Sequence, residues 1–319
     1  MQAELIINNG GILYAPAVLE DIKLSSERCG TPSKLSFKVI KDSTLKIEKG
    51  DEVRFKWNGN DMFYGFIFDK KNDKENIIEV TCYDQLRYLK NKDTYVYENK
   101  TASEVLKLIT GDFNLQTGTI DDTAFKIASR VEDNQTLFDI IQNALDLTME
   151  NKKELYVLYD DYGKIALRSL ENMRVNILID AATAENYSYS SSIDDNTYNK
   201  IKLVFDNEET GKRDVYIAQH GENINKWGVL QYYDTLQKGE NGKAKADALL
   251  ELYNKKTRNL KIKNTFGDCR VRAGSLIGVH LDLGDVKLKN WMLVESCKHV
   301  FKLNEHFMDL TLRGGEFVG

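Results

Sequence analysis

Alternating hydrophobic and polar residues dominate the first ninety positions of the chain. Polarity changes at every residue in Leu35–Val39 and again in Val53–Trp57. A period of two puts successive side chains on opposite faces of a strand, so one face packs on a core. The pair Asn58-Gly59 follows directly and supplies the positive φ angles of a tight hairpin turn. These patterns predict a small antiparallel barrel or sandwich that ends in a short helical segment near Leu89.

The hydrophobic period changes between about residues 100 and 149. Thr101 and Glu104 have the spacing of a helical capping box, and apolar residues follow at helical spacing. A second helix is predicted to begin near Thr136, because apolar residues again recur three and four apart. A hairpin with its turn at Asp160–Gly163 comes next and is expected to cover the two helices.

Strands are predicted again from about Tyr187. The segment Asn199–Phe205 alternates in polarity and leads into a polar hairpin tip at 206–213. Strong helix formers predict an inserted helix at about 243–256. The fold class predicted is therefore mainly β with an α+β insert, with two small antiparallel β-barrel domains flanking a helix-plus-hairpin domain. The predicted boundaries are 1–96 for the first barrel, 97–180 for the α+β domain and 181–319 for the second barrel.

Two distant segments share one layout. Ile47-x-x-Gly50-Asp51-x-Val53 and Val271-x-x-Gly274-Ser275-x-Ile277 each precede a strand, a hairpin, a second strand, a polar turn and a third strand. Antiparallel β segments also come to resemble one another by chance, so the pattern alone leaves duplication and coincidence both open. If the barrel is duplicated, three copies of the chain present six similar faces, which suits docking onto a six-fold tube.

The composition of the 319 residues excludes several classes of protein. Hydrophobic residues make up 42% and charged residues 29%, as in ordinary globular proteins. The formal net charge of −5 gives no basic surface for nucleic acid. No basic region with an apolar run follows the start of the chain, and no run approaches the length of about 20 residues that spans a bilayer. We expect assembly in a cytosol, with release only by lysis.

The histidines and cysteines have no metal-binding spacing. None of the four histidines lies in an HExxH motif or at helical i, i+4 spacing, although His299 and His306 are expected on neighbouring strands of the last hairpin. A metal or acid–base pair there is the functional alternative to ordinary strand histidines. The other two histidines are His220 and His280, and the scattered cysteines, expected to be buried small hydrophobes, are Cys29, Cys82, Cys269 and Cys297.

Acidic pairs are the remaining candidates for catalysis. The two carboxylates of a glycosidase lie about 5 to 10 Å apart across a cleft, whereas adjacent residues in turns are better explained as solvated loops. The chain also lacks the GxSxG, GxxxxGK[ST] and strand-linked GxGxxG motifs. We therefore predict no catalytic, cofactor-binding or metal-binding residues and no cofactor. The pairs considered are Asp121-Asp122, Asp160-Asp161 and Asp194-Asp195.

Five aromatic residues gather between positions 57 and 68. A sugar-binding platform is one interpretation, since ring faces stack on sugars. Alternation instead predicts that Phe63 and Tyr64 point to opposite faces, so that about half of the cluster is core and the outward half forms a subunit interface. The cluster consists of Trp57, Phe63, Tyr64, Phe66 and Phe68.

A family resemblance rests on short motifs spread over nearly the whole chain. They are Gly50-Asp51-x-Val53, Tyr64-Gly65-x-Ile67, Cys82-Tyr83-Asp84-x-Leu86-x-Tyr88-Leu89 and Thr101-Ala-x-Glu104. In these residues the chain resembles the XkdQ-type proteins of PBSX-like prophages and phage tail-like bacteriocins. The layout is also similar to the larger late-control-D and baseplate-hub family, which includes the spike proteins of type VI secretion.

The resemblance implies a structural, non-enzymatic baseplate hub of a contractile phage-like tail. In that family three chains form a homotrimer whose two tube-like barrels per chain make a pseudo-six-fold ring. The implied partners are the tail tube protein, the spike protein and the baseplate wedge proteins, without nucleic-acid-specific binding or membrane insertion. No needle or lytic extension follows Gly319, so spike and hydrolase are expected to be separate chains. The rival interpretations are a cell-wall polysaccharide hydrolase and a carbohydrate-binding adhesin of the same particle.

Overall fold

The computed structural model describes residues 3–41, 43–74, 76–183, 186–194, 197–207, 211–236, 240–282 and 287–314. The chain forms two compact units. The first comprises Met1–Ser188 with Leu260–Gly319, and the second comprises Tyr189–Asn259. The predicted division into three domains at residues 97 and 181 stays a prediction.

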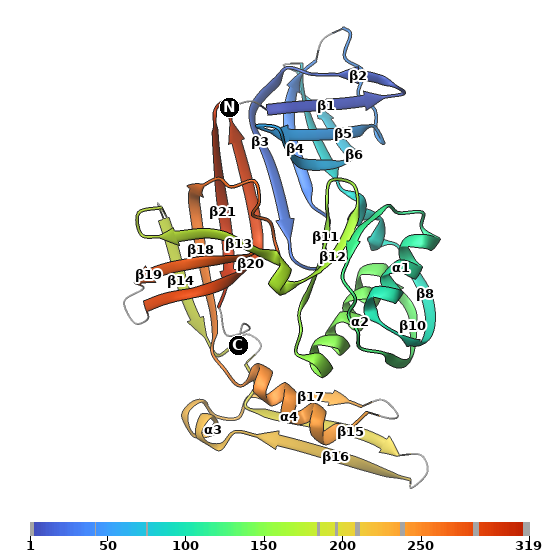
Figure 1. The fold of residues 1–319 in the computed structure, drawn as a ribbon, viewed down its shortest axis with the longest axis vertical. Helices are drawn as coiled ribbons and strands as arrows, with labels where there is room; N and C mark the ends of the chain where they lie inside the picture. Colours follow the sequence, from blue (N-terminus) through green and yellow to red (C-terminus); the bar gives the residue numbers. More distant parts are fainter. Residues whose placement is uncertain are drawn as a thin grey trace. The chain divides into compact units, whose positions relative to one another are not determined.

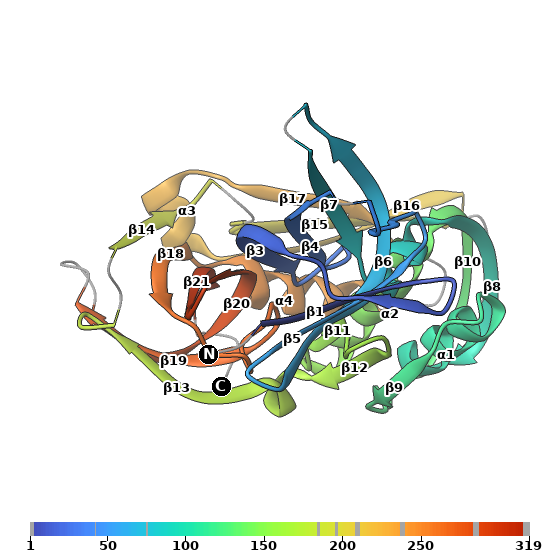
Figure 2. The same ribbon diagram turned by 90° about the horizontal axis from the view of Figure 1, so that it is seen from above.

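A large, mainly antiparallel sheet is the framework of the first unit (Figures 1 and 2). Its main path runs β14-β18-β21-β20-β3-β4-β7-β6-β5-β1-β2, and β19 and β13 branch from β20. The strands are β1 Ala3–Asn9, β2 Ile12–Tyr14, β3 Val18–Glu27, β4 Lys34–Ile40, β5 Glu52–Trp57, β6 Asn60–Asn72, β7 Ile77–Tyr83, β13 Arg174–Asp180, β14 Asn186–Ser192, β18 Thr257–Phe266, β19 Leu276–Asp282, β20 Lys287–Lys302 and β21 Glu305–Arg313.

The predicted fold class, mainly β with an α+β insert, is confirmed. The prediction of two closed barrels is wrong. Among the described residues no sheet closes into a barrel. The strands expected in two separate barrels instead belong to one open 13-stranded sheet. The physical reason is the strand β20, which pairs with a strand from the other end of the chain instead of closing its own half.

The strand β20 joins the two halves of the sheet because it has three partners. Its first half pairs with β19, and its second half lies between β21 and β3. In Figure 1, β20 lies between β3 and β21. At the end of this ladder the Arg28 amide donates to the Glu295 carbonyl at 3.0 Å, and the two side chains form an ion pair at 2.8 Å. The N-terminal strands are therefore tied directly to the C-terminal ones.

The two segments of the internal repeat make matching backbone hydrogen bonds. Gly50 N–H donates to the Ile67 carbonyl at 2.8 Å, and Gly274 N–H donates to the Val294 carbonyl at 2.7 Å. The return bonds also match, because the amides of Ile67 and Val294 each donate at 2.9 Å, to the carbonyls of Asp51 and Ser275. The same two turn residues cap their loops: Asp51 Oδ2 accepts from Glu48 N–H at 2.7 Å and Ser275 Oγ accepts from Arg272 N–H at 3.0 Å.

Strand order extends this correspondence. The order β3-β4-β7-β6-β5 in the first half matches β14-β18-β21-β20-β19 in the second. The second unit is therefore inserted between β14 and β18, at the position that only a short turn occupies between β3 and β4. The halves differ at one edge, since β1 is antiparallel to β5 whereas β13 is parallel to β19.

The core of the N-terminal half follows the predicted alternation. Every second residue of β4 and β5 is buried. Asn58 and Gly59 have φ angles of 49° and 78°, as the predicted hairpin turn requires. Phe301 of β20 enters the same core and contacts the ring of Phe55 edge to face at a centroid distance of 4.9 Å. One aromatic side chain from the C-terminal half thus completes the N-terminal core.

The α+β insert packs two helices against small sheets. Thr101 and Glu104 form the predicted capping box at the start of α1, and Thr136 caps α2. The predicted hairpin contributes Tyr156, Ile165 and Leu167 to the helical core, so it covers the helices as expected. The elements are η1 Gln85–Lys90, β8 Lys92–Lys100, α1 Ala102–Asp112, β9 Thr117–Ile120, β10 Ile127–Thr136, α2 Leu137–Lys152, β11 Tyr156–Asp160, β12 Ile165–Ser169 and η2 Leu170–Met173.

The second unit is a three-stranded sheet covered by a helix. The central strand β15 is antiparallel to β16 and parallel to β17. Ala246 and Leu249 of α4 pack on Ile201 and Leu203 of β15. Residues 208–210 of the predicted hairpin tip lie outside the described residues. The elements are β15 Lys200–Asn207, β16 Lys212–Gln219, α3 Gly221–Trp227, β17 Gln231–Thr235 and α4 Gly242–Tyr253, the last in the range expected for the inserted helix.

Candidate functional site

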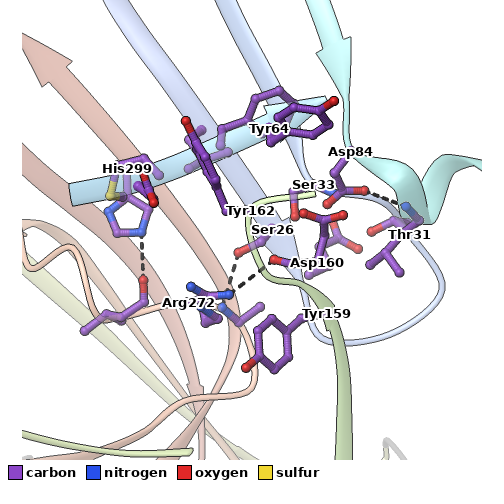
Figure 3. A pocket seen from close by; sticks show the side chains of 18 of the residues that line it. Ser26, Thr31, Ser33, Tyr64, Asp84, Tyr159, Asp160, Tyr162, Arg272 and His299 are labelled. Atoms are coloured by element: carbon purple, nitrogen blue, oxygen red, sulfur yellow. Dashed lines mark hydrogen bonds between the residues drawn. The ribbon is translucent and has the colours of Figure 1, made fainter. Parts of the chain in front are cut away.

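A cavity of about 50 Å³ marks the place where three parts of the first unit meet. The N-terminal half contributes residues of β3 and β6 and Asp84, which directly follows β7. The α+β insert contributes Leu86 of η1 and the tip of the β11–β12 hairpin, and the C-terminal half contributes the loop 268–275 and β20. Figure 3 shows side chains from all three parts around this cavity. The labelled lining residues are Ser26, Thr31, Ser33, Tyr64, Asp84, Tyr159, Asp160, Tyr162, Arg272 and His299.

The hairpin tip is bound tightly to the N-terminal half. Gly163 has a φ angle of 85°, and a Cβ atom there would lie 2.5 Å from the ring of Tyr64. Only glycine allows this approach without strain. The Gln85 side-chain amide donates to the Gly163 carbonyl, and its Oε1 accepts from Gln116 N–H at 3.2 Å. Tyr64 and Tyr162 also meet edge to face at a centroid distance of 5.9 Å.

Arg272 ties the same hairpin to the C-terminal half. Its Nη1 donates to the Asp160 carbonyl at 3.2 Å and lies 3.6 Å from Asp161 Oδ1. Its guanidinium carbon lies 4.6 Å from the ring centroid of Tyr159, within the range of a cation–π contact. Arg272 belongs to the second repeat turn, so the turn that starts β19 also holds the hairpin.

Two carboxyl groups of the cavity have unusual electrostatics. Asp84 is 1% exposed and accepts from the amides of Leu86 and Ser33 at 3.0 and 2.9 Å. Burial raises the pKa of Asp84 to about 8, and the nearby charge of Asp160 adds to the effect. Burial also raises the pKa of Asp160 to about 6, against the opposing effect of the Gly163 amide. The pair therefore favours a protonated state in the range where solvated carboxyls are ionised.

The predicted neighbours His299 and His306 do come together. His299 Nδ1 and His306 Nε2 are 2.9 Å apart, and His299 Nε2 lies 2.9 Å from the Val271 carbonyl. Since a carbonyl only accepts, His299 Nε2 is the protonated nitrogen and Nδ1 accepts from His306. Burial lowers the pKa of His299 to about 3 and that of His306 to about 4. Both rings are neutral at pH 7, and their nitrogens bond to each other instead of converging on an ion.

The acidic pairs are not alike. The interpretation of Asp160 as a solvated loop residue is wrong, because its Oδ2 atom is buried, while Asp161 is exposed as expected. Asp121, directly after β9, accepts from Ser169 N–H at 2.8 Å and from Asn172 Nδ2 at 2.9 Å. It therefore links the end of β9 to η2. Asp194 is exposed, and Asp195 lies outside the described residues.

Other candidate residues are spread over the molecule. All four cysteines are free; Cys82 and Cys297 are buried and Cys269 is partly buried, but Cys29 is exposed, contrary to expectation. His220 caps α3, and His280 is exposed on β19. In the described parts of the chain no group of three or more potential ligands is placed to hold a metal ion. Within those same ranges, no helix is long and apolar enough to cross a membrane.

The aromatic cluster divides between two faces as predicted. Trp57 and Phe63 are buried in the core, 2% and 3% exposed. Phe66 and Phe68, on the other face, pack against Tyr88 at centroid distances of 6.3 and 6.2 Å. The outward half is thus occupied largely by contacts within the chain, which weakens the sugar-platform and subunit-interface interpretations of these particular residues.

The chemistry of the cavity suits contacts between segments of the same chain. Burial raises the pKa of the Cys269 thiol that lines the cavity, which disfavours the nucleophilic thiolate form. The hydrogen-bonding groups of Gln85 and Arg272 are engaged with backbone carbonyls and amides of other segments. These two residues escaped the sequence reasoning. One sequence signal near Gln85 was available. Asp84 directly follows a predicted strand and precedes a predicted helical turn, and this is a position where a helix-capping residue is expected.

Comparison with known proteins agrees with this architecture. The YqbQ-like family matches residues 22–313. YqbQ of Bacillus subtilis strain 168 is 32% identical over 305 residues, 92% of each chain. The chain belongs to the YqbQ-like family. Another relative, XkdQ of the phage-like element PBSX from the same strain, is 31% identical, again over 92% of each chain.

Solved structures share the fold of this YqbQ-like protein at low sequence identity. The 43 kDa tail protein of prophage MuSo2 from Shewanella oneidensis superimposes with a TM-score of 0.70 at 10% identity, covering 97% of this chain and 98% of the tail protein. An E. coli type VI secretion component, described as similar to the T4 tail proteins gp27 and gp5, has a TM-score of 0.59 at 10% identity and covers 100% and 78%. The YqbQ-like chain therefore has the fold found in phage tail proteins.

Proposed function

We propose that this YqbQ-like protein is a structural subunit of a phage-like tail baseplate, and specifically the hub that joins the tail tube to the central spike and nucleates assembly. Its relative XkdQ is a protein of a phage-like element, and the fold is shared with a prophage tail protein and a type VI secretion component. The hub is proposed as a homotrimer, with tube, spike and wedge proteins as partners, assembled in the bacterial cytoplasm and retained in the particle. A non-enzymatic role fits the cavity, where Arg272 and Asp84 bind other segments of the chain.

The duplicated β unit is the observation that carries the hub proposal. The two halves repeat the same turn hydrogen bonds and the same strand order. Two equivalent β units per chain give six in a trimer, and this number matches a three-fold hub to a six-fold tube ring. A hydrolase has no need of such a duplication.

We expect this stoichiometry to be visible in solution. Light scattering of the purified chain, alone and mixed with candidate spike and tube proteins from neighbouring genes, should give either a trimer or a complex with three copies per spike. The proposed ring forms on its spike, so the mixture is the decisive sample. A chain that stays monomeric with both partners present would contradict the hub role.

The edge strand β2 is the surface we expect to take part in assembly. Ile12 and Leu13 are 58% and 65% exposed, and β2 ends the described sheet. An apolar edge strand is a template for pairing with another chain. Leu13→Lys should leave the melting temperature unchanged but weaken trimer or partner binding by about tenfold or more, measured by analytical ultracentrifugation. Leu303→Lys, at a position 94% exposed in the β20–β21 turn, is the matched control and should bind normally.

A further inference from the structure

The joint between β20 and β3 begins at a defined place in the internal repeat. The contact of β19 with β20 ends at the pair Leu276–Leu293, and from Ser296 onward β20 pairs with β3 on the same side. The register of β20 against β21 shifts by one residue between Val294 and Ser296. The strand β3 therefore occupies the edge of β20 that the end of β19 leaves open.

The N-terminal half has the same arrangement at the equivalent residues. The contact of β5 with β6 ends at the pair Glu52–Phe66, the counterpart of the last β19–β20 pair. The register of β6 against β7 then shifts by one residue directly after Ile67, as that of β20 shifts against β21. Residues 69–72 of β6 are thus equivalent to residues 296–299 of β20.

The edge of β6 that corresponds to the β3-binding edge of β20 is open. Residues 69–72 pair with β7 on one side, and among the described strands none pairs with them on the other. Figure 2 shows the β6–β7 hairpin extending beyond β5. The side chains of Lys71 and Asn72 are exposed. This edge therefore offers backbone N–H and C=O groups to another strand.

The counterpart of β3 in the second half is β14, whose outer edge is open as well. The strand β14 pairs with β18, as β3 pairs with β4, and it ends the main path of the described sheet. Most of its residues are exposed, and Tyr187 is 44% exposed. The segment Asn186–Ser192 contains neither proline nor lysine, which commonly block pairing at an edge. Each chain thus carries one complete joint and the two separate halves of a second.

We propose that the open edge of β6 in one copy of the chain pairs antiparallel with the open edge of β14 in the next. This interface repeats between copies the joint that β20 and β3 form within one chain. It joins two different surfaces, and such head-to-tail contacts close into a ring when the rotation from copy to copy permits. The proposal rests on the self-association inferred for the hub and names the strands that carry it.

Disulfide cross-linking of the full-length chain tests this pairing. In a Cys29→Ser background, which lacks the exposed thiol, Lys71→Cys is combined with a cysteine at each position of β14 in turn. Oxidised samples, alone and mixed with candidate spike proteins from neighbouring genes, are separated on non-reducing gels. Directly opposite residues of adjacent strands lie within disulfide range. One β14 position should therefore dominate, with bands at two and three times the mass of the chain.

Two further variants exclude chance collisions between copies. Asp69→Cys in place of Lys71→Cys should move the dominant β14 position by two residues towards the C-terminus, because the proposed pairing is antiparallel. Lys298→Cys with Ser25→Cys is the matched control, since these residues are partners in the β20–β3 joint and Lys298 is the equivalent of Lys71. This control should form its disulfide within one chain and give no band of higher mass.

The outcomes distinguish the edge pairing from the hub role. Links between copies that show the two-residue shift support the pairing. A sample that is trimeric by light scattering, alone or on the spike, but forms no such link would overturn the pairing and leave the hub role standing. A link from β6 to β14 within single chains would also overturn the pairing. Chains that neither link nor associate under any of these conditions would contradict both.

Discussion

Replacing Gly274 by alanine should destabilise the protein by about 3 kcal/mol or more, because two separate costs coincide there. Gly274 has a φ angle of 90°, which side-chain-bearing residues adopt only with strain. A Cβ atom would also lie 2.2 Å from Val157 Cγ1, on the hairpin strand β11. Urea denaturation followed by circular dichroism measures the loss in the free energy of unfolding.

The internal repeat provides the control for this variant. Gly50 occupies the equivalent turn with a φ angle of 92°, but a Cβ atom there would have nothing within 4 Å. Gly50→Ala should therefore cost only the backbone strain, about 1–2 kcal/mol. Adding Val157→Ala to Gly274→Ala should cost less than the sum of the two single changes. Equal effects at Gly50 and Gly274, with additive double-mutant behaviour, would contradict a tight contact between this turn and the hairpin.

The His299–His306 pair should destabilise the fold in acid. The unfolded chain takes up protons on these rings below pH 6.5, while burial keeps the pKa values of the folded pair at about 3 and 4. The contribution of each ring to stability is therefore full above pH 6.5. As the pH falls towards 4, that contribution decreases by up to about 1.4 kcal/mol per pH unit.

The raised pKa values of Asp84 and Asp160 act in the opposite direction over the same range, because these carboxyls keep protons in the folded state. The histidine effect must accordingly be read as a difference between variants. His299→Gln retains an amide donor for the Val271 carbonyl, and its stability deficit relative to the unaltered protein should shrink by about 1.4 kcal/mol per pH unit between pH 6.5 and 4. His280→Gln, at an exposed position of β19, is the matched control. A deficit for His299→Gln that does not change with pH would mean that this ring is not held neutral.

Local features of the fold were predictable from the sequence because their causes are local. The alternation of β4 and β5, the Asn58-Gly59 turn and the Thr101 capping box each depend on a few neighbouring residues. The repeated glycine turns were visible for the same reason, since a positive φ angle selects glycine wherever it occurs.

The joint between the halves was not predictable, because distant pairing leaves no mark in a local pattern. Glu295 and Arg28 are separated by 267 positions, and nothing in either segment specifies its partner. The burial of Asp160 was missed for the same reason. The turn sequence Asp160–Gly163 by itself predicts an exposed loop, and only the distant residues Arg272 and Gln85, which bind this turn, enclose it. The prediction of closed barrels was wrong for this reason too, because β20 pairs with the distant strand β3.

The pairing of β3 with β20 also sets the order of events during synthesis. While the ribosome extends the chain, β3 is made within the first thirty residues, yet its neighbour on one side is β20, made near the end. Until then β3 has a bare edge, and Phe301 is missing from the N-terminal core. Such long-range contacts slow folding and leave nascent chains prone to association. We infer that nascent copies stay incompletely folded until almost the whole chain has emerged.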